Sequence, residues 1–294
     1  MARWFVRLLV VAMVLLAARQ AASQPAWSGA AEGVVVLGRV SADRLDALGP
    51  VWYYQYGFAG DDIGDHRRIM LIRPHTRTDE LSSAMGQRRD AVWLVGNEPN
   101  DPNQDAMSPC AYARFYRWAE DVASRSDWGA RLVPAGIADA DIAYAEAFLA
   151  CYRRLYGREP RVAAWNIHNY ILDEGASQYD VRTFQERIVA FRDWMDDIGH
   201  GGLPLLLTEY GVLYGSGCCD HPAEPPEPGV AFLAATTRWL QQTDHVQAWA
   251  WFCLDSRGGS GASQFNGDLL SPEGALSPFG QAYQRTIAER YGRE

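Results

Sequence analysis

Short apolar runs alternate with helical stretches along the chain, and this alternation limits the fold more than any other feature. Eight runs rich in β-branched, aromatic and leucine residues are candidate strands, at 33–38, 52–57, 69–73, 91–96, 131–137, 162–168, 203–208 and 245–252. Strands that alternate with helices form βα units, which build a parallel sheet. Because eight such units close into a cylinder, the sequence predicts an α/β fold, a single (β/α)₈ TIM barrel.

The stretches between the runs carry helix signals. Residues 109–124 begin with Ser108 as the N-cap and Pro109 at the first helical position, and residues 181–198 show an apolar stripe that Gly199 can end. Weaker patterns predict helices at 140–157, 229–242 and 278–290. The second unit, at 58–67, is too short and glycine-rich for a full helix.

The first residues have the pattern of a secretory signal peptide. Arg3 and Arg7 precede an apolar run from Leu8 to Ala17, and small residues follow through Ser23. We therefore expect a leader at 1–23, a catalytic barrel at 24–294, and a secreted or periplasmic protein. The apolar run is shorter than the roughly 20 residues that a bilayer requires, so no membrane contact is expected once the leader is removed.

The charge balance narrows the class of partner. The chain has 27 basic and 36 acidic residues, and removal of the leader takes away three arginines and lowers the net charge from −9 to −12. Nucleic acids and anionic membranes are therefore poor partners. A neutral carbohydrate is unaffected by this charge, and the 11 tryptophans and 14 tyrosines suit sugar stacking as well as a packed core. We expect a monomer.

The five cysteines are an odd number for a chain that enters an oxidising compartment, so at least one stays unpaired. Cys110 and Cys151 lie near consecutive predicted helices and are candidates for a bridge. Cys218 and Cys219 lie in a loop that could meet Cys253, and the connectivity stays open. No two cysteines have the two-residue spacing of a zinc site, so we predict neither a metal centre nor a cofactor.

Several strands carry distinctive side chains near their carboxyl ends, which is where a TIM barrel places its active site. The fourth ends in Gly96-Asn97-Glu98-Pro99-Asn100, the sixth in Asn166-Ile167-His168-Asn169-Tyr170, the seventh in Thr208-Glu209-Tyr210-Gly211, and the eighth contains Trp249 and Trp251. An isolated Asn-Glu-Pro fits a solvated loop equally well. Glu209, however, ends a leucine run where a buried charge would be costly without a purpose.

In the order of these motifs the whole mature chain resembles the clan A glycoside hydrolases, which are retaining (β/α)₈-barrel glycosidases, and within them the small glucan-cleaving barrels of bacteria and fungi. The resemblance implies that Glu98 is the acid/base and Glu209 the nucleophile. It also implies that Asn97 binds the sugar 2-hydroxyl, that His168 and Tyr170 orient the carboxylates, and that Trp251 is the floor under the sugar. The substrate-binding candidates are Asn97, His168, Tyr170, Trp251, Trp249, Asn166, Trp52 and Arg73. Core packing is as good an explanation for the tryptophans, and Arg73 could simply pair with an acid.

Barrel geometry provides an independent estimate for the two glutamates. Strands four and seven of an eight-stranded barrel lie about 14 Å apart, and glutamates that reach about 4.5 Å inward leave their carboxyls about 5 Å apart. This separation favours double displacement with retention of configuration.

Other functions remain in view. A transglycosylase would use the same residues but exclude water, and a non-catalytic carbohydrate-binding barrel would be expected to lose one of the two glutamates. A metal-dependent hydrolase would need a His-x-His on an early strand, which none of the six histidines provides. Residues 220–229, with four prolines after the seventh strand, predict an active-site loop. The sequence leaves open the sugar, its linkage, and internal against terminal cleavage; the resemblance favours a β-linked glucan.

Overall fold

The strands form a closed parallel barrel, as predicted. The computed structural model describes residues 27, 29–125, 127–173, 175–215, 223–258 and 265–292. Its strands are β1 (Glu32–Val35), β2 (Trp52–Tyr54), β3 (Arg68–Ile72), β4 (Val92–Asn97), β5 (Arg131–Gly136), β6 (Trp165–His168), β7 (Leu205–Gly211) and β8 (Ala248–Phe252). They pair in the order β5-β4-β3-β2-β1-β8-β7-β6, and a parallel bridge between Ile137 and Ile167 joins β5 to β6. Each observed strand overlaps its predicted run.

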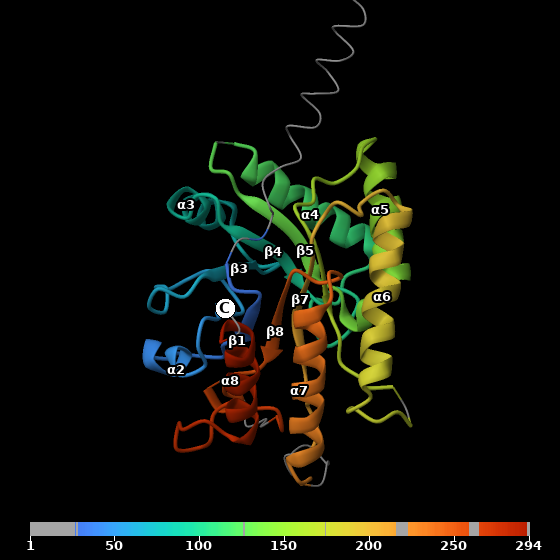
Figure 1. Ribbon diagram of the computed structural model, residues 1–294. Coiled ribbons are helices and arrows are strands. Elements are labelled where there is room, and N and C mark those ends of the chain that lie inside the picture. The colour runs from blue at the N-terminus through green and yellow to red at the C-terminus, as the bar shows by residue number, and fades with distance from the viewer. Residues whose placement is uncertain are drawn as a thin grey trace, which may run out of the picture.

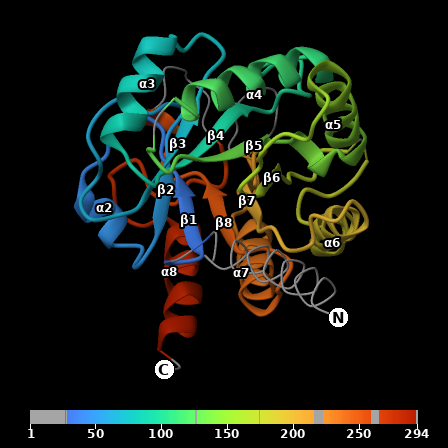
Figure 2. The same cartoon turned by 90° about the horizontal axis from the view of Figure 1, so that it is seen from above.

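Helices surround the strands on the outside, as Figures 1 and 2 show. They are α2 (Ala42–Asp46), α3 (Thr78–Gln87), α4 (Pro109–Ala123), α5 (Ile142–Tyr156), α6 (Val181–Asp197), α7 (Glu227–Gln242) and α8 (Pro278–Tyr291). All five predicted helices are confirmed, and Ser108 caps α4 by accepting from the Ala111 N–H group. No helix lies between β2 and β3 in the described residues 55–67, which also agrees with the sequence.

The core has two layers because side chains alternate along each strand. One set fills the inside of the barrel, and the other packs under the helices. Trp52 belongs to the inner set but lies at the first residue of β2, and its indole N–H donates to the carbonyl of Ala31 at 2.9 Å. Gly33 leaves room for it, since a Cβ there would lie 2.3 Å from the indole. The predicted substrate role of Trp52 is therefore wrong, because its ring closes the opposite end of the barrel.

The tryptophans of β8 face the helices and not the inside of the barrel. Trp251 is fully buried, donates to the carbonyl of Gly267 at 2.7 Å, and lies against Phe279 of α8. Trp249 belongs to the same outer layer. The narrow interior takes the alternate residues of this strand, which include Phe252. The proposed sugar floor at Trp251 is thus contradicted, since the helical layer covers that face.

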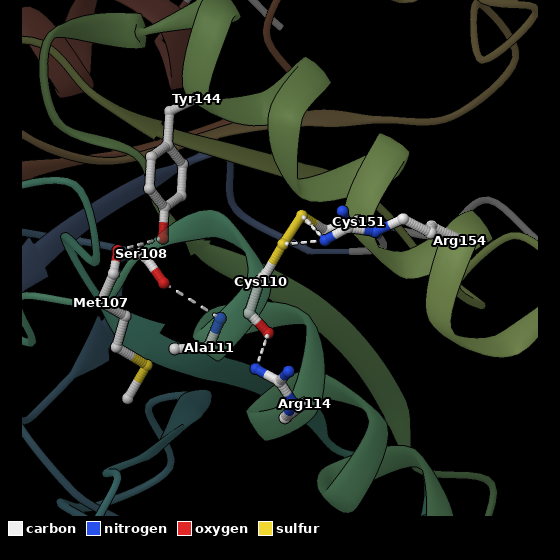
Figure 3. Close-up of a disulfide and its surroundings, with 8 residues drawn as sticks. All are labelled: Met107, Ser108, Cys110, Ala111, Arg114, Tyr144, Cys151 and Arg154. Carbon is white, nitrogen blue, oxygen red and sulfur yellow. Dashed lines mark hydrogen bonds between the residues drawn. A yellow bond between two sulfur atoms is a disulfide. The ribbon is translucent and has the colours of Figure 1, made fainter.

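A disulfide joins Cys110 in α4 to Cys151 in α5, one of the bridges that the sequence allows (Figure 3). The Arg154 guanidinium donates to both sulfurs, at 3.0 and 3.6 Å. Cys253 is free and buried, which contradicts a bridge from it to Cys218 or Cys219.

Several predictions fall on residues that the structure does not describe. These are the leader at 1–23, Cys218 with Cys219, and the first part of the loop at 220–229. In the part of the chain that is described, no helix is both long and apolar enough to span a bilayer.

Candidate active site

Glu98 follows β4 directly and is held by an unusual backbone. Its φ of 43° lies in the left-handed region, and the φ of Gly96, two residues earlier, is 94°. A left-handed conformation costs a non-glycine residue about 1–2 kcal/mol, so the surrounding contacts must impose it. One of these contacts is a hydrogen bond in which the Glu98 N–H group donates to the carbonyl of Gly136 on β5 at 3.0 Å.

Glu209 reaches the mouth of the barrel because β7 is irregular. The register with β8 shifts between Leu207 and Tyr210. In a regular strand Glu209 would share the outward face of Leu205 and Leu207, which pack under the helices. A local irregularity of this kind re-aims a side chain, and here it lets Glu209 turn inward while Tyr210 packs outward.

The two glutamates meet around His168. One carboxylate oxygen of each glutamate and a ring nitrogen of His168 all lie within 4.8 Å of one another. His168 Nδ1 is 2.8 Å from Glu98 Oε1 and 3.5 Å from Glu209 Oε2. The three side chains are buried. The separation agrees with the value of about 5 Å expected from barrel geometry.

Three tyrosine hydroxyls donate to Glu209. Tyr54 and Tyr56 bond to Oε1, the latter at 2.7 Å, and Tyr170 bonds to Oε2 at 2.8 Å. Burial and the charge of Glu209 raise the pKa of Tyr54 and Tyr170 well above the ordinary value, so these hydroxyls stay protonated as donors. Hydrogen bonds to a carboxylate favour its charged form. Both carboxylate oxygens of Glu209 therefore face hydroxyl donors.

Tyr56 differs from the other two because 38% of its surface is exposed. Its ring is thus open to solvent while its hydroxyl contacts Glu209, so a molecule that approaches Glu209 would touch this ring. In the sequence, Tyr54 and Tyr56 belong to the alternating run from Trp52 to Tyr56, which fits the far side of the cleft and, at least as well, core packing. Strand parity is the sequence signal for a place at the cleft, because both tyrosines have the parity of Trp52 and follow it toward the carboxyl end of the strand.

Glu98 has the opposite character. Burial, with the charge of Glu209 in support, raises the pKa of Glu98 above its ordinary value, although the contact with His168 acts in the other direction. Burial disfavours the charged ring of His168, but the charges of Glu209 and Glu98 outweigh this effect and raise its pKa. The site thus pairs a carboxyl whose pKa is raised by burial with a carboxylate that accepts three hydroxyl hydrogen bonds, and unequal environments of this kind separate the roles of two carboxyl groups.

His168 fits only because residue 136 lacks a side chain. A Cβ built on Gly136 would lie 2.0 Å from His168 Nε2. We expect Gly136→Ala to displace the His168 ring and to break its contacts to Glu98 and Thr208. The value of kcat/KM should fall by at least about tenfold, since general acid–base catalysis contributes about 10²- to 10⁴-fold. Steady-state assays and thermal unfolding would measure this.

Gly86→Ala is the matched control for that variant. A Cβ on Gly86, within α3, would make ordinary contacts of 3.5 Å with the Trp128 indole. Activity should be unchanged and stability equal or higher by up to about 1 kcal/mol, because alanine is the better helix former. Equal activity of Gly136→Ala and the parent would refute the steric argument.

Other predicted residues support the site from behind. Arg73 pairs with Asp105 at 3.0 Å, and Asp105 accepts the backbone N–H of Asn97 at 2.7 Å. Arg73 therefore has the acidic partner that the sequence left as an alternative. The Asn97 side chain donates to Gln104 at 3.2 Å, and its buried Oδ1 has no partner among the described residues. Asn166 is fully buried and contacts Thr208, not the cleft.

The trio of Glu98, His168 and Glu209 has the composition of a metal site, so the donor geometry must be tested. Glu209 already accepts three hydroxyl groups, and the ring nitrogen closest to both carboxylates lies at hydrogen-bond distance from Glu98. A cation would have to displace these contacts. The arrangement fits a hydrogen-bonded acid–base cluster better than a set of ligands.

A (β/α)₈ barrel that brings two buried glutamates together at the carboxyl ends of β4 and β7 has the active-site arrangement of a carbohydrate-cleaving enzyme. The family model described as the glycosyl hydrolase catalytic core matches residues 45–283. The chain belongs to this family of glycoside hydrolases. A search of curated proteins by sequence finds no match.

Solved structures share the fold. An endo-β-1,3-glucanase of GH128 subgroup II from Sorangium cellulosum has a TM-score of 0.67 and 21% identity, over 87% of this chain and 98% of that one. A subgroup I endo-β-1,3-glucanase variant from Amycolatopsis mediterranei, in complex with laminaripentaose, has a TM-score of 0.66 and 19% identity, over 88% of this chain and 100% of that one. A curdlan-specific exo-β-1,3-glucanase from Blastomyces gilchristii has a TM-score of 0.61 and 18% identity, over 85% of this chain and 97% of that one.

Proposed function

We propose that this protein is a retaining glycoside hydrolase of the clan A type that cleaves a β-linked glucan, with Glu209 as nucleophile and Glu98 as acid/base. The observation that carries the proposal is the pair of buried carboxyls with oxygens within 4.8 Å and opposite environments. Retaining enzymes hold their carboxyls about 5–5.5 Å apart, whereas inverting enzymes need about 6.5–9.5 Å to admit a water.

The reaction follows from the two environments. Glu209 attacks the anomeric carbon, and Glu98 gives its proton to the departing glycosidic oxygen. A covalent glycosyl ester on Glu209 results. Glu98, now ionised, takes a proton from water, which attacks the same carbon and releases the sugar with its original configuration. The three tyrosine hydroxyls can stay in place through both steps. They stabilise the Glu209 carboxylate before it attacks, and they stabilise it again when it leaves the sugar carbon.

The substrate proposal rests on the structures of similar fold. The solved structures named above are β-1,3-glucanases, with endo and exo members, and structures of the Amycolatopsis mediterranei enzyme contain laminaritriose or laminaripentaose. We propose a β-1,3-glucan as substrate. We also propose export, which the Cys110–Cys151 disulfide supports, since such bonds persist in oxidising compartments.

Proton NMR of a laminarihexaose digest tests substrate and mechanism together. We expect reducing ends that appear first as the β-anomer and then mutarotate. Curdlan should also be degraded, whereas xylan and a β-1,4-glucan should not. First appearance of the α-anomer would refute the retaining mechanism. Release of sugar from none of these polymers would refute the substrate and favour the carbohydrate-binding alternative, while products longer than laminarihexaose would indicate a transglycosylase.

A further inference from the structure

A chain of hydrogen bonds leads from Glu98 away from the cleft into the buried interior of the barrel. His168 Nδ1 lies 2.8 Å from Glu98 Oε1, and its Nε2 lies 3.0 Å from Thr208 Oγ1. The Thr208 hydroxyl in turn donates to Asn166 Oδ1 at 2.9 Å. All four side chains are buried, so water cannot replace a missing partner.

The direction of this chain assigns the protons of the imidazole ring. A threonine hydroxyl has one proton, and Thr208 gives it to Asn166. Toward His168 the same oxygen can therefore only accept, so Nε2 must carry a proton. The hydrogen bond at one ring nitrogen decides which nitrogen titrates. Here that nitrogen is Nδ1, which faces both Glu98 and Glu209.

We propose that Thr208 and Asn166 are positioning residues that hold His168 as an imidazolium with its Nδ1 proton directed at Glu98. With both present, each N–H group of the charged ring has an acceptor. The inference rests on the proposed function for the part that Glu98 plays. It adds two residues that act through His168 and touch neither the sugar nor the reacting atoms.

The charges around the ring are consistent with an imidazolium. In the described structure the ionisable groups that face it are Glu98 from the end of β4 and Glu209 from β7. The hydroxyls of Tyr54, Tyr56 and Tyr170 bond to Glu209. The other neighbours of the ring are uncharged, namely Gly136 from β5 and Thr208, which precedes Glu209 in β7. A cation there therefore meets two acidic groups and no second positive charge.

The imidazolium has a defined task in the first step. Glu98 Oε1 is occupied by His168, which leaves Oε2 to carry the proton that passes to the glycosidic oxygen. The bond from Oε2 to this proton breaks as the new O–H bond forms, and the electron pair stays on the Glu98 carboxylate. The Nδ1 proton does not move. It donates a charge-assisted hydrogen bond to the new anion, which is about twice as strong as a neutral one.

Nitrogen-15 NMR of histidine-labelled protein reads the ring directly and does not depend on activity. The His168 signals are identified by their loss in His168→Asn. In the wild type we expect Nε2 to stay protonated through the titration while Nδ1 gains and loses its proton. In Thr208→Val the Nε2–H group loses its acceptor, so the neutral ring should carry its proton on Nδ1 instead. Thr208→Ser restores the hydroxyl and should restore the wild-type pattern.

Kinetics on laminarihexaose gives the second readout. We expect kcat of Thr208→Val to fall by about tenfold, because the neutral ring offers Glu98 only an ordinary hydrogen bond. KM should stay within about twofold, since Thr208 lies behind His168, and Thr208→Ser should recover most of the loss. Valine has the shape of threonine, and thermal unfolding checks that the variant is folded.

Three results would overturn the inference while leaving the proposed function intact. The first is a neutral wild-type ring with its proton on Nδ1, which would mean that the Asn166 amide nitrogen faces Thr208 and the chain runs the other way. The second is an unchanged ring in Thr208→Val. The third is an equal loss of kcat in the valine and serine variants. Absence of glucan cleavage by the wild type would instead count against the proposed function, and the NMR result would still stand.

Discussion

Replacement of Glu209 by glutamine is expected to reduce kcat on β-1,3-glucan by at least about 10⁴-fold, the scale of loss when a covalent nucleophile is removed. The amide nitrogen would also face a hydroxyl donor at whichever position it takes, since Tyr56 bonds to Oε1 at 2.7 Å and Tyr170 to Oε2 at 2.8 Å. One oxygen would still accept, so the variant should fold and bind oligosaccharide. Reducing-sugar release and calorimetric binding of laminarihexaose would measure the two effects.

Replacement of Glu209 by a smaller residue tests whether this carboxylate is the nucleophile or has only a structural role. In Glu209→Gly, azide should enter the vacated space and restore cleavage of an activated aryl glucoside, with an α-configured glycosyl azide as product. Glu186→Gln is the matched control, because this glutamate is exposed and pairs with Arg182 at the surface. Its activity should equal that of the wild type. A β-configured azide from Glu209→Gly would show that the roles of the two glutamates are reversed.

Replacement of Glu98 by glutamine or alanine should have the second largest effect, and its size should depend on the leaving group. On polysaccharide, where the departing alcohol needs a proton, we expect a fall of about 10²- to 10⁴-fold. On a dinitrophenyl glucoside the first step needs no acid. The second step then limits the rate, so a burst of phenolate should precede slow turnover, and azide should accelerate turnover with a β-configured product.

The pH dependence provides a further check on Glu98. Its pKa is raised in the folded protein, chiefly by burial. Because the acid must be protonated for the first step, kcat/KM should persist above the ordinary range of a glutamate and fall as pH rises through this raised pKa. The alkaline fall should be absent from the profile of Glu98→Ala on the activated glucoside. An unchanged alkaline limb in that variant would assign the limb to another group.

Much of the fold follows from local patterns. Eight apolar runs separated by capped amphipathic helices admit few arrangements, and Ser108 before Pro109 marks the start of α4 in both sequence and structure. The positions of Glu98, His168 and Tyr170 could also be predicted from the sequence, because residues at the carboxyl ends of barrel strands face a common mouth.

The error at the tryptophans of β8 has a physical cause, which is that strand parity says which residues share a face but not which face is inside. Trp249 and Trp251 do share a face, and it is the outer one. Glu209 would follow Leu207 outward without the register shift in β7, and a shift of this kind leaves no mark in composition. Tyr54 and Tyr56 share the parity of Trp52, but parity alone does not separate a residue of the cleft from one packed in the core. The cysteine pairing likewise depends on which helices are neighbours in space.

Two of the three hydroxyls on Glu209 come from Tyr54 at the end of β2 and from Tyr56 just after it, whereas both glutamates lie in the segment from β4 to β7. A half-barrel fragment with these four strands would thus contain both reacting groups and still lack two of the three hydroxyl donors that contact Glu209. The reaction centre exists only when the first and second halves of the chain have come together. Catalytic turnover is therefore a strict reporter of complete folding, and any split or circularly permuted form would have to reunite β2 with β7 before it could work.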